Sequence, residues 1–233
     1  MLRIYKADER YRTDLPWLKS RLSFPFADHI DPDNPPFGPL RVFNEDRIAG
    51  GRGFGGHPHR EMEIVSVVLG GRLRHEDSLG HVAETGYGEV QRMSAGSGIV
   101  HSETNPGEDE VHLLQIWFTP AERGLAPSYE TTSYSLEAMR GRLLPLASAQ
   151  GGEGIARVHQ DLTLYISELD PGQRLVFEQP EGRRIYLYVL KGVLELPYGE
   201  RLEQGDGARL TDTPQLPLTA ADAGARYVLI DLP

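Results

Sequence analysis

The stretch GRGFGGHPHREMEIVSVVLG, Gly51–Gly70, contains the pattern that decides the fold. Its glycines precede two histidines, His57 and His59, and an apolar run, Glu63–Leu69, follows them. In an extended chain, side chains two residues apart leave the same face, so the two imidazoles lie side by side and Glu63 shares their face. Glycine lets the chain bend tightly before this pair. The stretch therefore predicts a β-strand that presents two neighbouring imidazoles, a pair well suited to a divalent metal.

Apolar runs of the same kind recur along the chain. They are four to eight residues long, rich in Val, Ile, Leu and Tyr, and bounded by Gly or Pro, which is typical of strands in a sandwich or barrel. Helical spacing occurs only in Ser135–Gln150, where Pro145 interrupts it. The predicted fold class is all-β. The clearest predicted strands are Glu63–Leu69, Val111–Phe118, Arg184–Leu190 and Arg226–Leu232.

Composition excludes several classes of protein. A formal charge of −10 argues against a protein that binds nucleic acid directly, because phosphate contacts need a concentrated basic face. The absence of cysteine excludes disulfide scaffolds, thiolate catalysis, zinc fingers and iron–sulfur clusters, so nitrogen and oxygen must hold any metal. The first residues are charged, and no apolar run approaches the roughly 18 residues that span a bilayer. We therefore expect a cytoplasmic protein that does not enter the membrane.

Two segments of the chain are repeated after an offset of about 120 residues. Val68–Leu73 resembles Val189–Leu194, and Glu84–Gly88 resembles Glu203–Gly207. Both copies combine a strand, a glycine turn, a second strand and a Gly-x-Gly turn. The repeat predicts two similar β-barrels, although two ordinary hairpins with similar turn residues would give the same pattern.

A second polar segment, Ser94–Asn105 (SAGSGIVHSETN), places His101 and Glu103 two residues apart. They too leave one face of an extended chain. If this segment lies beside the strand of His57 and His59, three nitrogens and one carboxylate oxygen meet. Such a set leaves coordination positions open, which suits iron(II), manganese, nickel or copper better than a closed structural zinc.

These segments resemble the two cupin motifs. The first motif, G(x)5HxH(x)3–4E(x)6G, is matched at every fixed position, and the second, G(x)5PxG(x)2H(x)3N, is matched with two differences. Ser94 replaces its proline, and two extra residues precede its histidine. The matching residues are Gly51, His57, His59, Glu63 and Gly70 in the first motif, and Gly88, Gly96, His101 and Asn105 in the second.

The chain resembles the pirin family in these two differences from the general cupin pattern. Three of its segments also resemble pirins: SFPFADHIDP (Ser23–Pro32), HPHREME and SAGSGIVHSE. The resemblance is specific to about residue 130 and weaker beyond it. It implies a bicupin, in which two antiparallel β-barrels of the jelly-roll type pack face to face. It also implies one divalent metal, usually iron(II), with manganese, nickel, copper, cobalt or zinc as alternatives.

The same resemblance implies which residues hold the metal. Many cupins use the glutamate that corresponds to Glu63, whereas pirins use the one that corresponds to Glu103. The implied ligands are therefore His57, His59, His101 and Glu103, with Glu63 as an alternate ligand or a residue that supports one.

The predicted domains are a metal-binding cupin over residues 1–133 and a degenerate cupin over residues 134–233. The offset of the repeat places Glu178, Pro180 and Arg184 where the second domain would need two histidines and a glutamate. No histidine follows His159 in the sequence, so we expect no metal in the second domain.

The implied activity is that of a quercetin 2,3-dioxygenase, which opens the central ring of a flavonol with dioxygen and releases carbon monoxide. Glu103 is the expected catalytic residue, as the acceptor of the flavonol hydroxyl proton. The alternative is a non-enzymatic iron protein that acts as a regulator or redox sensor through protein partners, as some animal pirins do.

The remaining aromatic and imidazole side chains have simpler interpretations. Single histidines beside apolar or charged neighbours are expected to be packed or at the surface. A structural role is expected for the histidine of the N-terminal segment. The tryptophan of QIWF is expected in the core, with a place beside a small-molecule pocket as the alternative. These residues are His75, His81, His112 and His159, then His29, and then Trp117.

Overall fold

The structure is a computed structural model that describes residues 1–26 and 29–233. Ala27 and Asp28, which belong to the segment Ser23–Pro32, lie outside the described residues. The chain forms two compact units, each built from separate segments. The histidine unit comprises Tyr11–Tyr134 and Ala149–Gln160, and the C-terminal unit comprises Met1–Arg10, Ser135–Ser148 and Asp161–Pro233.

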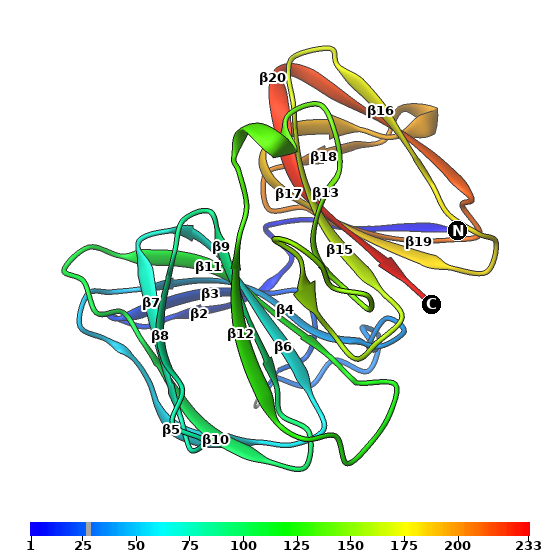
Figure 1. Ribbon diagram of the computed structural model, residues 1–233. Helices are drawn as coiled ribbons and strands as arrows, with labels where there is room; N and C mark the ends of the chain where they lie inside the picture. Colours follow the sequence, from blue (N-terminus) through cyan, green and yellow to red (C-terminus); the bar gives the residue numbers. More distant parts are fainter. Residues whose placement is uncertain (27–28) are drawn as a thin grey trace. The chain divides into compact units, whose positions relative to one another are not determined.

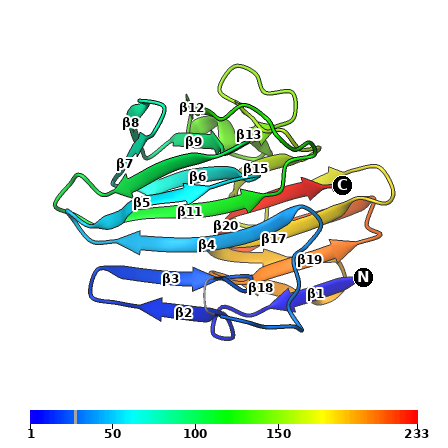
Figure 2. The same ribbon diagram turned by 90° about the horizontal axis from the view of Figure 1, so that it is seen from below.

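The histidine unit contains a seven-stranded and a four-stranded antiparallel sheet (Figure 1). In Figure 2 the blue strands β2, β3 and β4 lie side by side at one edge of the larger sheet. In sheet order, the larger sheet consists of β12 (Ser128–Ser133), β9 (Glu89–Ser94), β6 (Glu63–Gly70), β11 (Val111–Phe118), β4 (Leu40–Ile48), β3 (Leu18–Leu22) and β2 (Tyr11–Asp14). The smaller sheet consists of β5 (Gly53–His59), β10 (Ile99–Thr104), β7 (Arg72–Asp77) and β8 (Val82–Gly86), and the short strand β14 (Ala156–Arg157) also belongs to this unit.

Alternation of side chains places polar residues inside the histidine unit. Along β10, Ile99, His101 and Glu103 are buried, while Val100 between them is 47% exposed. Along β7, Leu73 and His75 are buried in the same alternating way. Since every second residue of a strand faces the same side, the two strands carry their imidazoles and carboxylate toward the facing sheet.

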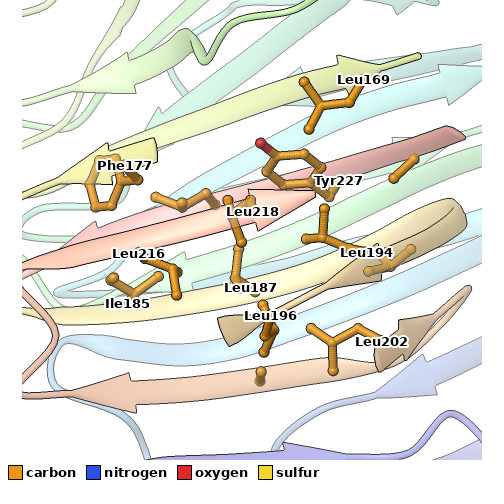
Figure 3. Close-up of a cluster of buried hydrophobic side chains, with 14 of the residues drawn as sticks. Leu169, Phe177, Ile185, Leu187, Leu194, Leu196, Leu202, Leu216, Leu218 and Tyr227 are labelled. Atoms are coloured by element: carbon orange, nitrogen blue, oxygen red, sulfur yellow. The ribbon is translucent and has the colours of Figure 1, made fainter. Parts of the chain in front are cut away.

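The C-terminal unit is also built from antiparallel strands and encloses its own apolar core. Figure 3 shows Leu187, Leu194, Leu218 and Tyr227 within this core. Its strands are β1 (Leu2–Tyr5), β19 (Gly207–Thr211), β17 (Arg184–Glu195), β20 (Gln215–Leu232), β15 (Thr163–Leu169) and β13 (Leu144–Ser148) in sheet order, with β16 (Arg174–Glu178) paired to β20 and β18 (Arg201–Glu203) paired to β17.

Helical structure in the described residues is limited to two short 3₁₀ helices, η1 (Glu137–Met139) and η2 (Pro197–Gly199). No helix in this part of the chain is long and apolar enough to cross a bilayer. The prediction of an all-β fold is confirmed, although the strands of the histidine unit form facing sheets instead of a closed barrel.

The four clearest strand predictions are confirmed by β6, β11, β17 and β20. The helical interpretation of Ser135–Gln150 is wrong, because this segment forms only η1 and then β13. Gly141, at a φ of +69°, turns the chain out of a helical path, and Pro145 cannot donate the hydrogen bond that a helix would need.

The repeated segments turn on glycines of matching conformation. Gly71 has a φ of +73° and Gly192 a φ of +77°. A Cβ at Gly71 would lie 2.9 Å from Val111 Cα, and a Cβ at Gly192 would lie 2.0 Å from the carbonyl oxygen of Gly224. In each unit a strand corner therefore presses against a neighbouring backbone where only glycine fits.

Candidate metal centre

Three of the predicted ligands lie together on the smaller sheet of the histidine unit. Strands β5 and β10 pair so that His57 is directly opposite His101. His59 lies two residues further along β5, on the same face, and is opposite Ile99. The ring centroids are 4.5 Å apart for His57 and His101, 4.8 Å for His57 and His59, and 4.9 Å for His59 and His101. One possible ligand atom from each residue lies within 4.8 Å of the others.

Each of these imidazoles has one ring nitrogen, Nε2, without a hydrogen-bond partner. His57 Nδ1 donates to the carbonyl oxygen of Gly55 at 2.8 Å, which leaves the lone pair at Nε2. The Nε2 atoms of His59 and His101 are buried and have no hydrogen-bond partner. Buried polar atoms without partners are costly, and a divalent metal would satisfy all three nitrogens at once. The donor set therefore fits a metal ion.

Electrostatics favours the neutral, metal-binding form of the same imidazoles. Burial and then the nearby His57 lower the pKa of His59 to about 4. Burial, followed by the charges of His57 and His59, lowers the pKa of His101 to about 3. Since only unprotonated imidazole binds a metal, both side chains are prepared for ligation at neutral pH.

Glu103 is buried next to His101 and is held by the facing sheet. Gln115 Nε2 donates to Glu103 Oε2 at 2.7 Å, and Gln91 Nε2 donates to Oε1. Ser66 lies between the two glutamines in the register of β9, β6 and β11, so the three residues form one row across the sheet. Burial raises the pKa of Glu103 to about 7, although the hydrogen bonds oppose this rise. Glu103 forms a second group of possible metal ligands with His75 and His101, so His101 belongs to both groups, whereas Glu103 is not grouped with His57 and His59.

Glu63 lies in neither of the two groups found among the described residues. Its buried carboxylate accepts hydrogen bonds from Ser94 Oγ at 2.6 Å and from the backbone N–H of His159 at 3.1 Å. His159 Nδ1 lies 3.3 Å from the same carboxylate. The contacts of Glu63 in the structure are thus with Ser94 and His159.

His75 is the site residue that the sequence interpretation missed. It is fully buried, its Nδ1 lies 3.3 Å from His101 Nδ1, and its ring stacks on Tyr129 at a centroid distance of 4.1 Å. Its parity with the apolar Leu73 on β7 was a usable signal, because that parity places it on the inner face.

The other single histidines lie in different surroundings. His81 contacts Asp77, His112 Nε2 lies 2.7 Å from Glu45 Oε1, and His29 stacks on Tyr11.

The three histidines and Glu103 line a cavity of about 640 Å³. All the residues that line it belong to the histidine unit. One polar part of its wall is formed by Ser20, Asn44 and Asp46, whereas much of the remaining wall is aromatic. Trp117, for which a place beside a small-molecule pocket was the alternative to the core, lies in this wall and edge-on to His59 at a centroid distance of 4.8 Å. The aromatic side chains are Tyr11, Trp17, Phe26, His29, Phe54 and Trp117. Flat, largely apolar walls beside a polar cluster fit a planar aromatic ligand.

The metal-free protein is expected to lose stability as the pH falls from about 7.5 to about 5. In the folded protein the pKa values of His59, His75 and His101 are lowered from 6.5. As the pH falls through 6.5, these histidines therefore take up protons in the unfolded chain but stay neutral in the folded one, which favours unfolding. The pKa of Glu103 is raised from 4.5, which has the opposite sign over the same interval, but three histidines outweigh one glutamate. Urea unfolding of the metal-free protein at several pH values measures this slope. A free energy of unfolding that stays constant or rises on acidification would contradict the prediction.

Comparison with known proteins agrees with the predicted family and the all-β fold. The family model described as Pirin matches residues 5–118, and that of the Quercetinase C-terminal cupin domain matches residues 145–232. The chain is 39% identical over 234 residues to a quercetin 2,3-dioxygenase of Escherichia coli K12, covering 100% of this chain and 99% of the relative.

Two solved structures of a bacterial protein are similar over the whole chain. YhhW from Escherichia coli superposes with a TM-score of 0.94 at 37% identity, covering 100% of this chain and 98% of that one. The bacterial pirin YhhW in complex with nickel(II), also from Escherichia coli, gives a TM-score of 0.93 at 37% identity, with coverage of 100% and 99%. The resemblance drawn from the two histidine motifs is thereby confirmed, and the chain belongs to the pirin family.

Proposed function

We propose that this pirin is a metal-dependent quercetin 2,3-dioxygenase, which opens the central ring of flavonols with dioxygen and releases carbon monoxide. One observation carries the proposal. Three imidazoles whose Nε2 atoms have no hydrogen-bond partner line the same cavity as a set of aromatic side chains. The name of the full-length relative from Escherichia coli supports the same reaction.

The proposed ligands are His57, His59, His101 and Glu103, and the proposed metal is divalent, with iron(II) the first candidate. Nickel(II) in the similar bacterial pirin supports a divalent ion of this kind. When bound, the metal supplies a Lewis acid for the flavonol oxygens and a redox partner for dioxygen. In this proposal the metal-binding domain is residues 1–133, and residues 134–233 carry no metal.

The cavity walls orient the substrate. Trp117 packs edge-on against both His59 and Phe26, which fixes one aromatic wall close to the histidines. A flat flavonol that lies along this wall loses its water shell and brings its hydroxyl toward the polar end of the cavity. The apolar walls also keep water away from the reacting ring.

Glu103 is the proposed acceptor of the flavonol hydroxyl proton. Its carboxylate is buried at the polar end of the cavity, beside His101. The amides of Gln91 and Gln115 hold its two oxygens in place, while each oxygen keeps a further lone pair for a proton or a metal. A carboxylate held in this way can take up a proton without moving its backbone.

The proposal is tested by incubating iron-loaded protein with quercetin in air. The expected result is loss of the flavonol absorbance together with release of carbon monoxide, and neither is expected from metal-free protein or without dioxygen. Metal-loaded protein that leaves quercetin unchanged and releases no carbon monoxide would refute the proposal. If the oxidation state of the iron then altered binding to other proteins, the regulatory alternative would replace it.

A further inference from the structure

A line of three polar side chains leads away from the histidine cluster into the turn after β7. His101 Nδ1 lies 3.3 Å from His75 Nδ1, and His75 Nε2 lies 2.9 Å from Asp77 Oδ2. The side chains of His75 and Asp77 have no exposed surface. Metal binding by His57, His59 and His101 does not by itself require His75 and Asp77.

Asp77 acts as an acceptor at the end of the line. Its Oδ1 accepts the backbone N–H of Leu79 at 2.9 Å and that of His81 at 3.1 Å, because the chain turns at this point. Its Oδ2 lies 2.9 Å from His75 Nε2, so both oxygens face N–H groups and the carboxylate can only accept.

The donor roles then follow along the line. Since Asp77 only accepts, His75 must donate through Nε2–H, and neutral His75 therefore has its lone pair at Nδ1. His101 faces this lone pair with its own Nδ1 and must donate a proton to it. The lone pair of His101 is then at Nε2, which is the buried atom without a partner beside the other histidines.

The ring of His75 is also fixed against rotation. It stacks on Tyr129 with an interplanar angle of 13°, and the Tyr129 hydroxyl donates to Gln91 Oε1 at 3.0 Å. Gln91 in turn donates to Glu103. A continuous set of contacts through His75, Tyr129 and Gln91 thus connects His101 with Glu103.

We propose that His75 and Asp77 are positioning residues that hold His101 as the Nδ1–H tautomer and thereby present its Nε2 lone pair to the metal. The proposal rests on the metal site of the proposed function, and it assigns to β7 a role in preparing that site before any metal binds. Outer partners of this kind typically change metal affinity by about 10- to 100-fold.

The tautomer is measured directly on the metal-free protein by long-range ¹H–¹⁵N correlation of the histidine rings. In the unchanged protein, His101 is expected to carry its proton at Nδ1 and His75 at Nε2. Asp77→Asn places an amide N–H₂ opposite His75 Nε2, so both tautomers are expected to reverse. His101 with its proton at Nε2 in the unchanged protein, or an unchanged spectrum in the variant, would overturn the proposal.

Metal affinity gives a second measurement, made with nickel(II) alone in competition with a chelator. Asp77→Asn and His75→Phe, which keeps the stacking on Tyr129, are each expected to weaken binding by about 10- to 100-fold. His81→Gln is the matched control, because His81 also contacts Asp77 but its side chain is 40% exposed and lies outside the line. Its affinity is expected to stay within about twofold of the unchanged protein.

Other outcomes separate this proposal from the proposed function. If X-ray absorption shows that His75→Phe removes one nitrogen from the bound nickel, His75 is a ligand and the positioning role is wrong. If the unchanged protein binds no nickel, the metal-dependent function fails, while the spectra of the metal-free protein still decide where the protons lie. Asp77→Asn keeps the shape of its side chain, so the test stands even if His75→Phe does not fold.

Discussion

Protein in which both His57 and His101 are replaced by alanine is expected to be purified without metal, whereas the unchanged protein carries about one metal ion per chain. The two substitutions remove two of the three imidazoles whose centroids lie within 4.9 Å of one another. His59 and Glu103 would remain, and two ligands on separate strands do not retain a divalent ion through purification. Turnover of quercetin is expected to disappear with the metal.

Elemental analysis of protein purified without chelators measures this loss. His112→Ala is the matched control, because His112 belongs to the same unit but contacts Glu45 and lies in neither ligand group. This control is expected to keep its metal. Stoichiometric metal in the double variant would show that the ion is held elsewhere.

Replacing Gly53 by alanine is expected to damage the site although it removes none of the proposed ligand side chains. A Cβ at Gly53 would lie 2.2 Å from the carbonyl oxygen of Glu103 and 2.5 Å from Thr104 Cα, both of them backbone atoms of β10. Backbone cannot give way as a flexible side chain can, so β5 must move and take His57 and His59 with it. We expect a loss of about 3 kcal/mol in the free energy of unfolding, equivalent to a fall of roughly 6–12 °C in Tm.

The control for this prediction comes from the same strand. A Cβ at Gly55 would meet no atom within 4 Å, so Gly55→Ala is expected to change stability by less than about 0.5 kcal/mol. Thermal unfolding and nickel binding of the two variants are measured together. Equal Tm values and equal nickel affinities of the two variants would show that β5 tolerates a methyl group at Gly53, where it pairs with β10, and would contradict the prediction.

The sequence predicted which side chains of the candidate site share a strand face, because strands have a period of two. That period places His57 beside His59, and the same rule puts His101 and Glu103 on one face of the neighbouring strand. The rule is local, so it predicts which side chains share a face but not which strand lies opposite. The choice between Glu63 and Glu103 therefore came only from the resemblance to the pirins. In the structure Glu63 contacts His159, which lies 96 residues further along the chain.

Pairing between strands that are far apart in the sequence could not be predicted from the residues of either strand alone. Strand β1 pairs with β19 near the opposite end of the chain, and its four residues, LRIY, give no indication of this partner. His75 is a different case. Its burial follows from its parity with Leu73, but its role depends on Asp77, whose acceptor function is set by the turn that follows.

The row Gln91–Ser66–Gln115 has a consequence for what acid does to this protein. Amides and hydroxyls do not ionise in the physiological range, so Gln91, Ser66 and Gln115 keep their charge when the pH falls. Glu103 does not keep its charge, because burial raises its pKa to about 7, well above the values of about 4 for His59 and about 3 for His101. Mild acid therefore first removes the negative charge from the end of this row, while the neighbouring imidazoles are still neutral.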